Sequence, residues 1–385
     1  MKIGYLYIGS PTHGINRYAR LIAAEAQTRS HLDVIEAAVE LSDNPQRDRT
    51  AIIEAAKQLS AADVVHFQYN RTIWGDKRTQ LTHLDTFLDR CTAPLVVTLH
   101  DIFYPPSSSM LVQQHFANPG SVRFTDWAKA VVRDRVSANL LALQKVIARS
   151  QQVFVCTQEE ARRLQQRMTT SKINVVPHFI EVRNIEITRE AARTALDLEG
   201  FHVITLLGFI YSGKGHQLLV ETLPQLPENT RMVFAGSVSP GHEAYFESLM
   251  TLAEKTGVRD RIRVTGYLSE SDLESYLMAT DLAVCPFKQT SASSSLASWI
   301  SVARPVLASK LPQIEEYNQL QPNAIATFDP YTAEALQAAI QHQFSTLEHT
   351  PNVAMFKLAQ DLHISKTVDL HLTHYQKTCL RVQSA

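Results

Sequence analysis

A lysine framed by two glycines is the residue of this sequence best suited to phosphate chemistry. The stretch 211–216 reads YSGKGH, follows the apolar run Val203–Leu207 and precedes a helical pattern that starts near Gln217. At a strand-to-helix turn, Lys214 and the helix N-terminus can both approach one anion. The spacing is not that of the G-x-x-x-x-G-K-[ST] phosphate loop. The pattern predicts either a phosphate-binding lysine or an exposed turn lysine.

A serine-rich segment is the second candidate for anion binding. It lies between the apolar run Leu282–Pro286 and the amphipathic run Leu296–Val302, and it begins with Thr290. Five of its eight positions from 291 on are serine: Ser291, Ser293, Ser294, Ser295 and Ser298. Serine hydroxyls cap helix N-termini, and together with backbone amides they can bind phosphate oxygens. Both interpretations stay open.

Ionisable side chains follow strands in the first half of the chain as well. His100 and Asp101 end the apolar run Leu95–Leu99. A histidine there can bind a sugar hydroxyl or carry a proton, or it can simply bond a loop carbonyl. For His178, a hydrogen bond to a loop carbonyl is favoured over a role in sugar binding or proton transfer. Gly14 opens a helix after the first apolar run, where it could admit a phosphate or serve a tight turn.

The elements that must position these loops alternate between strands and helices. Apolar runs predict strands at 3–8, 34–38, 64–67, 95–99, 153–156, 175–177, 203–207, 231–235, 262–265, 282–286, 306–309 and 324–328, with helical patterns between them. This rhythm is typical of parallel sheets covered by helices, in which ligands bind at the carboxyl ends of strands. We predict an α/β protein with two Rossmann-like, doubly wound parallel-sheet domains that face a cleft.

Length and composition favour two domains. The chain has 385 residues, 45% of them hydrophobic, which corresponds to two to three domains at roughly 150 residues each. The segment 180–200 is charged and lacks long apolar runs, so we place a boundary near residue 182. The predicted domains cover residues 1–182 and 183–356. A helical pattern over about 357–385 follows, and periodicity does not indicate which domain it packs against.

Charge and cysteine usage exclude several classes of function. Lys and Arg number 37 against 38 Asp and Glu, which leaves a formal charge of −1 and no basic excess for nucleic acid. The four scattered cysteines indicate neither a disulfide framework nor a zinc site, and no D-x-D pair indicates a divalent-metal site. The run Ile3–Ile8 is too short for a secretory signal. We expect a cytoplasmic protein without metal or cofactor.

One segment gives an alternative location at the inner face of a membrane. Arg123–Arg149 mixes Arg and Lys with Trp127, Val131, Val132 and Leu140. A surface helix that lies on anionic lipid has this composition, but so does an ordinary packed helix. Peripheral membrane contact is therefore one of two interpretations of this segment.

Five stretches of the chain, in order, resemble the family 4 (group 1) glycosyltransferases of the GT-B type over nearly its full length. They are 14–21 (GINRYARL), 94–101 (PLVVTLHD), 207–215, 264–279 and 304–309 (RPVLAS). The resemblance implies a nucleoside-diphosphate-sugar donor bound mainly by the second domain and an acceptor bound mainly by the first. It also implies retention of the anomeric configuration, no required metal, and a last helix that crosses back to the first domain.

The resemblance gives roles to the candidate residues. Lys214 corresponds to the lysine that neutralises the donor diphosphate, and His100 to the histidine beside the reacting sugar. Gly14 corresponds to a glycine that faces the diphosphate, and the loop with Tyr267 and Leu268 to the one that borders the nucleobase. The other donor-side candidates are Phe209, Gly215, Thr290 and the five serines. The acceptor-side candidates are His13, Asp101 and His178.

The chain departs from the family pattern at three positions. Thr290 and Ser298 stand where the family has two glutamates separated by seven residues, which hold the donor sugar and the ribose. Phe209 stands where an arginine is common, so the diphosphate site has one positive charge fewer. Neutral hydrogen bonds from Thr290, Ser298 and the serine-rich helix start could replace the lost contacts.

The sequence thus predicts a metal-independent, retaining transferase that moves a sugar to a glycan, a lipid-linked acceptor or a small molecule. Within the same fold, an inverting reaction with His13 as general base is the alternative. From another class, a noncatalytic GT-B protein that binds glycan or serves as a partner subunit fits the loss of three donor-binding side chains.

Overall fold

The protein was analysed as a computed structural model that describes residues 1–11, 13–70, 72–76, 78–102, 107–117, 120, 122–168, 170–181, 183–290, 292–346 and 352–383. The chain divides into two compact units. Unit 1 comprises Met1–His178 and Ile364–Ala385, and unit 2 comprises Phe179–His363. The division after His178 lies close to the predicted boundary at residue 182, whereas unit 2 extends beyond the predicted limit at residue 356.

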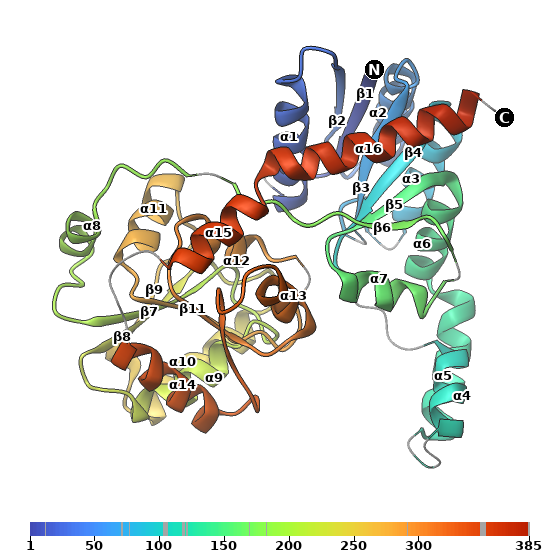
Figure 1. The fold of residues 1–385 in the computed structure, drawn as a ribbon. Coiled ribbons are helices and arrows are strands. Elements are labelled where there is room, and N and C mark those ends of the chain that lie inside the picture. The colour runs from blue at the N-terminus through green and yellow to red at the C-terminus, as the bar shows by residue number, and fades with distance from the viewer. Residues whose placement is uncertain are drawn as a thin grey trace. The chain divides into compact units, whose positions relative to one another are not determined.

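Unit 1 is a six-stranded parallel sheet with the strand order β2-β1-β3-β4-β5-β6 (Figure 1). Its strands are β1 (Lys2–Ile8), β2 (Asp33–Val39), β3 (Val64–Tyr69), β4 (Leu95–Leu99), β5 (Ser150–Val155) and β6 (Ile173–Val175). Its helices are α1 (Gly14–Gln27), α2 (Pro45–Leu59), α3 (Gln80–Arg90), α4 (Ser108–Ala117), α5 (Phe124–Val136), α6 (Ala138–Arg149), α7 (Gln158–Gln165) and α16 (Ile364–Gln383). Strands β3 and β4 are buried along their whole length, as expected for a parallel sheet covered on both faces.

The last helix of the chain packs against the sheet of unit 1. Helix α16 contacts α1, β3 and β5. Thr367, Val368, His371, Tyr375 and Thr378 are buried at helical spacing, so one face of α16 lies on the sheet. The helical pattern over 357–385 is therefore two helices, α15 (Val353–Asp361) in unit 2 and α16 in unit 1.

Unit 2 is a second six-stranded parallel sheet, with the strand order β12-β11-β10-β7-β8-β9. Its strands are β7 (His202–Leu207), β8 (Thr230–Ala235), β9 (Ile262–Val264), β10 (Leu282–Cys285), β11 (Val306–Ser309) and β12 (Ala326–Phe328). Its helices are α8 (Arg189–Ala195), α9 (His216–Thr222), α10 (Glu243–Lys255), α11 (Glu270–Ala279), α12 (Ser294–Ser301), α13 (Pro312–Leu320), α14 (Ala333–Thr346) and α15, with short 3₁₀ turns at Leu223–Gln225 and Arg259–Arg261.

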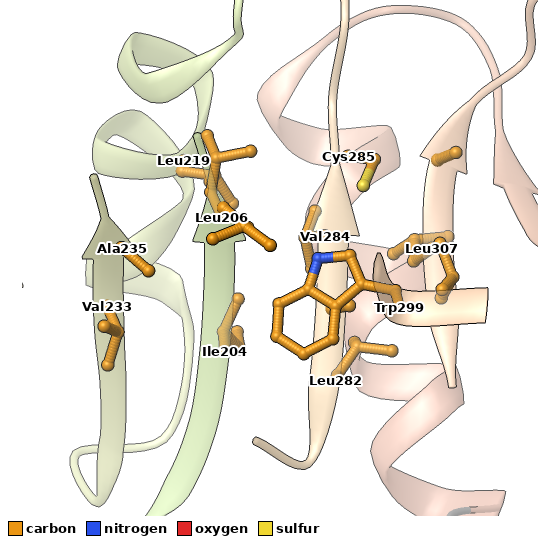
Figure 2. Close-up of a cluster of buried hydrophobic side chains, with 14 of the residues drawn as sticks. Ile204, Leu206, Leu219, Val233, Ala235, Leu282, Val284, Cys285, Trp299 and Leu307 are labelled. Carbon is orange, nitrogen blue, oxygen red and sulfur yellow. The ribbon is translucent and has the colours of Figure 1, made fainter. Parts of the chain in front are cut away.

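A tryptophan anchors the helix that carries the serine-rich segment. Trp299 of α12 is fully buried, and Figure 2 shows its indole beside β10 among Leu206, Val284 and Leu307. Burial of a large aromatic side chain contributes strongly to the stability of such a core. The packing of Trp299 therefore fixes α12, and with it the serines at the N-terminus of α12.

Most predicted strands are confirmed, several with ends shifted by one to three residues. The strand expected at 175–177 is β6, two residues earlier. The segment 123–149 contains two helices, α5 and α6. They are separate because Ser137 has an extended backbone and caps α6, its hydroxyl accepting a hydrogen bond from the Leu140 amide. Within the described residues, no helix is both long enough and apolar enough to span a bilayer.

Candidate active site

Lys214 lies in the loop between β7 and α9, at the carboxyl end of the unit 2 sheet. The residue is only 8% exposed, which excludes the exposed turn lysine. Its Nζ donates a hydrogen bond to Ser295 Oγ at 2.8 Å and lies 4.5 Å from the centroid of the Phe287 ring. Burial lowers the pKa of Lys214 to about 8. The sequence thus places an ammonium group of unusually low pKa beside the start of α12.

Two glycines allow this placement. Gly215 has φ +96°, and a Cβ there would lie 2.0 Å from the Pro286 carbonyl oxygen. Gly208 has φ +111°, and a Cβ there would lie 3.1 Å from Lys214 Nζ. Positive φ and close backbone approach are both conditions that favour glycine. Gly215 therefore turns the chain into α9, and Gly208 leaves room beside the ammonium group.

The sequence left two roles open for the serines, helix capping and anion binding, and the structure places different serines in different positions. Ser293 is the N-cap of α12, and its hydroxyl accepts a hydrogen bond from the Leu296 amide at 3.3 Å. Ser293 Oγ also lies 3.0 Å from Ser295 Oγ, so the cap is linked to the lysine. Ser298 donates a hydrogen bond to the Ser294 carbonyl within the helix at 3.1 Å. Ser291 lies outside the described residues.

The remaining donor-side candidates differ in exposure. Thr290 is buried, and Leu268 is partly buried against the core of unit 2. Phe209 and Tyr267 are exposed on loops at the carboxyl edge, at 54% and 81%. The structure joins Lys214 directly with Ser295, and in the described part of the chain no hydrogen bond links it to Tyr267.

Three histidines gather at the carboxyl edge of the unit 1 sheet. The Tyr18 ring packs against both His100 and His178, with ring centroids 5.3 and 5.0 Å apart. Burial lowers the pKa of His100 to about 3, with smaller contributions from the nearby His178 and His13. His100 is therefore a neutral imidazole at neutral pH, able to accept a hydrogen bond through one ring nitrogen.

The loop before α1 completes this edge. His13 caps α1, and its Nδ1 accepts a hydrogen bond from the Ile15 amide at 3.2 Å. Burial lowers the pKa of His13, which Asp101 partly offsets. Asp101 has φ +56° and accepts a hydrogen bond from Asn70 at 2.6 Å. Nothing lies within 4 Å of a Cβ added at Gly14, so the space beside this glycine is open.

The sequence interpretation missed Gln68 and His66 on β3. Both are buried, and Gln68 Oε1 lies 2.8 Å from His100 Nε2. The signal was present in the strand sequence VVHFQY, where two polar residues alternate with apolar ones inside a central strand. A polar pair at period two in a strand buried on both faces indicates a buried hydrogen-bond network.

One segment of the chain matches a family of known proteins. Residues 201–345 match the model of the glycosyl transferases group 1. Most of unit 2 is therefore similar to the glycosyl transferases group 1, and the match covers 145 of the 385 residues of the chain. The match covers the strand β7, the Lys214 loop and α12, and so includes the candidate donor site of unit 2.

Curated relatives are similar to this chain over part of their length. A D-inositol 3-phosphate glycosyltransferase of Xylanimonas cellulosilytica is 27% identical over 208 residues, which are 51% of this chain and 45% of the relative. An enzyme of the same name from Mycobacterium leprae is 29% identical over 148 residues, 37% of this chain and 34% of the relative. The chain thus matches less than half the length of these relatives.

Solved structures similar to this chain show that it has the GT-B fold. Anabaena HepE in complex with UDP has a TM-score of 0.71 at 15% identity and covers 98% of this chain and 100% of its own. The sucrose-phosphate synthase of Thermosynechococcus elongatus also has a TM-score of 0.71 at 15% identity, over 99% and 100% of the two chains. The similarity to both structures is consistent with the two six-stranded parallel sheets of this chain.

Proposed function

We propose that the protein transfers a sugar from a nucleoside-diphosphate-sugar donor to a glycan, a lipid-linked acceptor or a small molecule. In this proposal the reaction is retaining and needs no metal. The observation that carries it is the buried Lys214, held by Ser295 at the N-terminus of α12. A nucleoside diphosphate leaves with its negative charge on the phosphate oxygens, and a preorganised ammonium group stabilises that charge.

The comparisons support a uridine donor as the first to test. Anabaena HepE, which shares the fold, was solved with UDP and with UDP-glucose. In unit 2, the Lys214 ammonium and the α12 N-terminus would hold the diphosphate, and Tyr267 would lie beside the base. The neutral hydroxyls of Thr290 and Ser298 would take the places of the family glutamates.

In unit 1, His100 would orient the donor sugar. Its neutral imidazole can accept a hydrogen bond from a sugar hydroxyl without carrying a charge. His13, Asp101 and His178 lie at the same edge and are proposed to face the acceptor. Because Nδ1 of His13 is occupied by the Ile15 amide, only its Nε2 would be available in the alternative inverting reaction.

The test combines binding and turnover. Calorimetry with UDP, GDP, ADP and TDP, followed by assays with the corresponding sugars and EDTA, should give saturable binding of one nucleotide and sugar transfer without added metal. The anomer of the product, read by NMR, distinguishes retention from inversion. Binding without hydrolysis or transfer would favour the noncatalytic glycan-binding or partner subunit, and no binding at millimolar nucleotide would exclude the donor site.

The low pKa of Lys214 predicts that nucleotide binding takes up a proton at alkaline pH. The free protein loses the Lys214 proton as pH rises through about 8, whereas a bound diphosphate favours the charged lysine. Affinity for the nucleotide should therefore be greatest below pH 8 and fall as pH rises above it. Calorimetry at pH 9 in two buffers of different ionisation enthalpy measures the uptake, which should vanish in Lys214→Met.

We further propose that α4 and α5 form a surface for anionic membrane. Phe116, Phe124 and Val132 are 80%, 76% and 60% exposed on these helices. Arg123 is exposed beside Phe124 and pairs with Asp126 at 3.0 Å, and Lys129 is exposed on the same helix. Exposed aromatic side chains beside basic ones are the features of an interfacial helix. The two helices extend away from the sheet of unit 1 (Figure 1).

This surface predicts sedimentation with anionic vesicles. The protein should bind vesicles of phosphatidylglycerol and phosphatidylcholine more than phosphatidylcholine alone, because Arg123 and Lys129 are attracted to the anionic lipid. Burial of each phenylalanine contributes about 1.5–3 kcal/mol, so Phe116→Ser with Phe124→Ser should lower binding at least tenfold. Phe356→Ser is the matched control, since Phe356 is 55% exposed on α15. Equal loss in both variants would contradict the proposal.

A further inference from the structure

A series of buried polar groups crosses the sheet of unit 1 and ends at His100. His100 Nε2 lies 2.8 Å from Gln68 Oε1, and Gln68 Nε2 lies 3.4 Å from His66 Nε2. His66 Nε2 also lies 2.8 Å from Thr98 Oγ1, and its Nδ1 lies 2.6 Å from the Tyr375 hydroxyl. Gln68, His66, Thr98 and Tyr375 are each no more than 2% exposed. The network therefore joins α16, β3 and β4 to the carboxyl edge of the sheet.

With the Gln68 amide oriented as in the structure, one arrangement of protons satisfies every contact in this network. An amide oxygen only accepts hydrogen bonds, so His100 Nε2 carries the proton that Gln68 Oε1 accepts. The Gln68 amide nitrogen donates to His66 Nε2, and so does the Thr98 hydroxyl. His66 then carries its proton on Nδ1 and donates it to the Tyr375 oxygen. Burial holds the pKa of His66 well below its usual range, in keeping with this neutral form.

The arrangement leaves the second nitrogen of His100 as an acceptor. A neutral imidazole with its proton on Nε2 has an unprotonated Nδ1. Within the described residues, Nδ1 of His100 makes no hydrogen bond, and it is not among the buried atoms without a partner. The Tyr18 ring meets the imidazole edge to face, at an interplanar angle of 85°. Gln68 and Tyr18 together limit the ring to one orientation.

We propose that Gln68 is a positioning residue that fixes the protonation state and orientation of His100, so that Nδ1 accepts a hydrogen bond from a hydroxyl of the donor sugar. The inference rests on the proposed function, because it gives His100 its role in sugar transfer. In this arrangement His66, held between Thr98 and Tyr375, accepts a hydrogen bond from the Gln68 amide nitrogen, so that the amide oxygen faces His100.

The hydrogen bond itself can be tested by NMR, without activity. In protein labelled with ¹⁵N-histidine, the His100 signals, assigned by their loss in His100→Asn, should show a protonated Nε2 and an unprotonated Nδ1. Gln68→Met, which is similar in size but lacks the acceptor, should give a mixture of tautomers. Gln68→Glu keeps an acceptor oxygen and should keep the proton on Nε2. The control is Gln80→Met, because Gln80 is equally buried in unit 1 but bonds Tyr69.

The positioning role can be tested by a double-mutant cycle. Gln68→Met should lower kcat/KM for the donor about tenfold in the otherwise natural protein. In the His100→Asn background the same change should have less than a twofold effect, because a residue that acts through His100 has nothing left to position. Gln80→Met should leave kcat/KM within twofold in both backgrounds.

Two results would overturn the inference. One is a wild-type spectrum with the His100 proton on Nδ1, and the other is an equal loss of kcat/KM from Gln68→Met in both backgrounds, which indicates a purely structural role. If the proposed function were wrong, the results would differ from both of these. The wild-type protein would transfer no sugar from any donor, while the spectra would still decide whether Gln68 holds the His100 proton.

Discussion

Lys214→Met is expected to lower kcat/KM for the donor about 10²–10³-fold, the usual effect of removing one preorganised donor from a developing anion. Lys214 is the buried cation in the loop after β7, and its Nζ is fixed by Ser295. Phe209 stands where the resemblance implies an arginine, so in the proposed reaction the lysine would carry more of the charge stabilisation. Steady-state kinetics with a uridine-diphosphate sugar, together with calorimetry of UDP, measures the loss.

The stability of the folded Lys214→Met protein should not decrease. Methionine has nearly the length of lysine and no charge to desolvate, so the melting temperature of Lys214→Met should be unchanged or higher. Lys255→Met is the matched control, because Lys255 is exposed at the end of α10. Activity of Lys214→Met within threefold of the natural protein would show that Lys214 does not stabilise the leaving group. Loss of activity together with a lower melting temperature would point to a structural role instead.

Asp281→Ala is expected to destabilise unit 2 by about 3–5 kcal/mol, the usual cost of breaking a buried ion pair from one side. The Asp281 side chain is 3% exposed, and it accepts hydrogen bonds from Arg193 at 3.2 Å, from Arg189 and from the Val203 amide at 2.8 Å. Arg193 is 7% exposed. Without Asp281, the Arg193 guanidinium stays buried with backbone carbonyls as its only partners. The Val203 amide at the start of β7 also loses its hydrogen bond.

Hydrogen exchange read by mass spectrometry checks this prediction for each unit separately. Amides of β7 and β10 that exchange through unfolding of unit 2 should exchange about 10²–10⁴-fold faster in Asp281→Ala, since 1.36 kcal/mol is a factor of ten. Amides of β3 and β4 in unit 1 serve as an internal reference. Asp260→Ala, at an exposed aspartate, should change exchange by less than threefold. Equal protection in Asp281→Ala and the natural protein would contradict the argument.

The sequence determined the architecture because apolar periodicity is a local signal. Runs such as Leu95–Leu99 and Val203–Leu207 must be buried on both faces, so helices have to cover them, and parallel strands follow. The same reasoning placed Lys214 and His100 at the carboxyl ends of strands. The pattern of alternating elements cannot show which helices pack together, so periodicity did not separate α15 from α16.

Only the tertiary structure decided what the candidate side chains contact. Ser295 lies 81 positions from Lys214, and Gln68 lies 32 positions from His100, so no spacing rule in the sequence joins either pair. Lys214 is buried because β7, β10 and α12 surround the loop that carries it, and this burial lowers its pKa. Local patterns fix which elements form, whereas hydrogen bonds and desolvation depend on distances that exist only once the sheets have assembled.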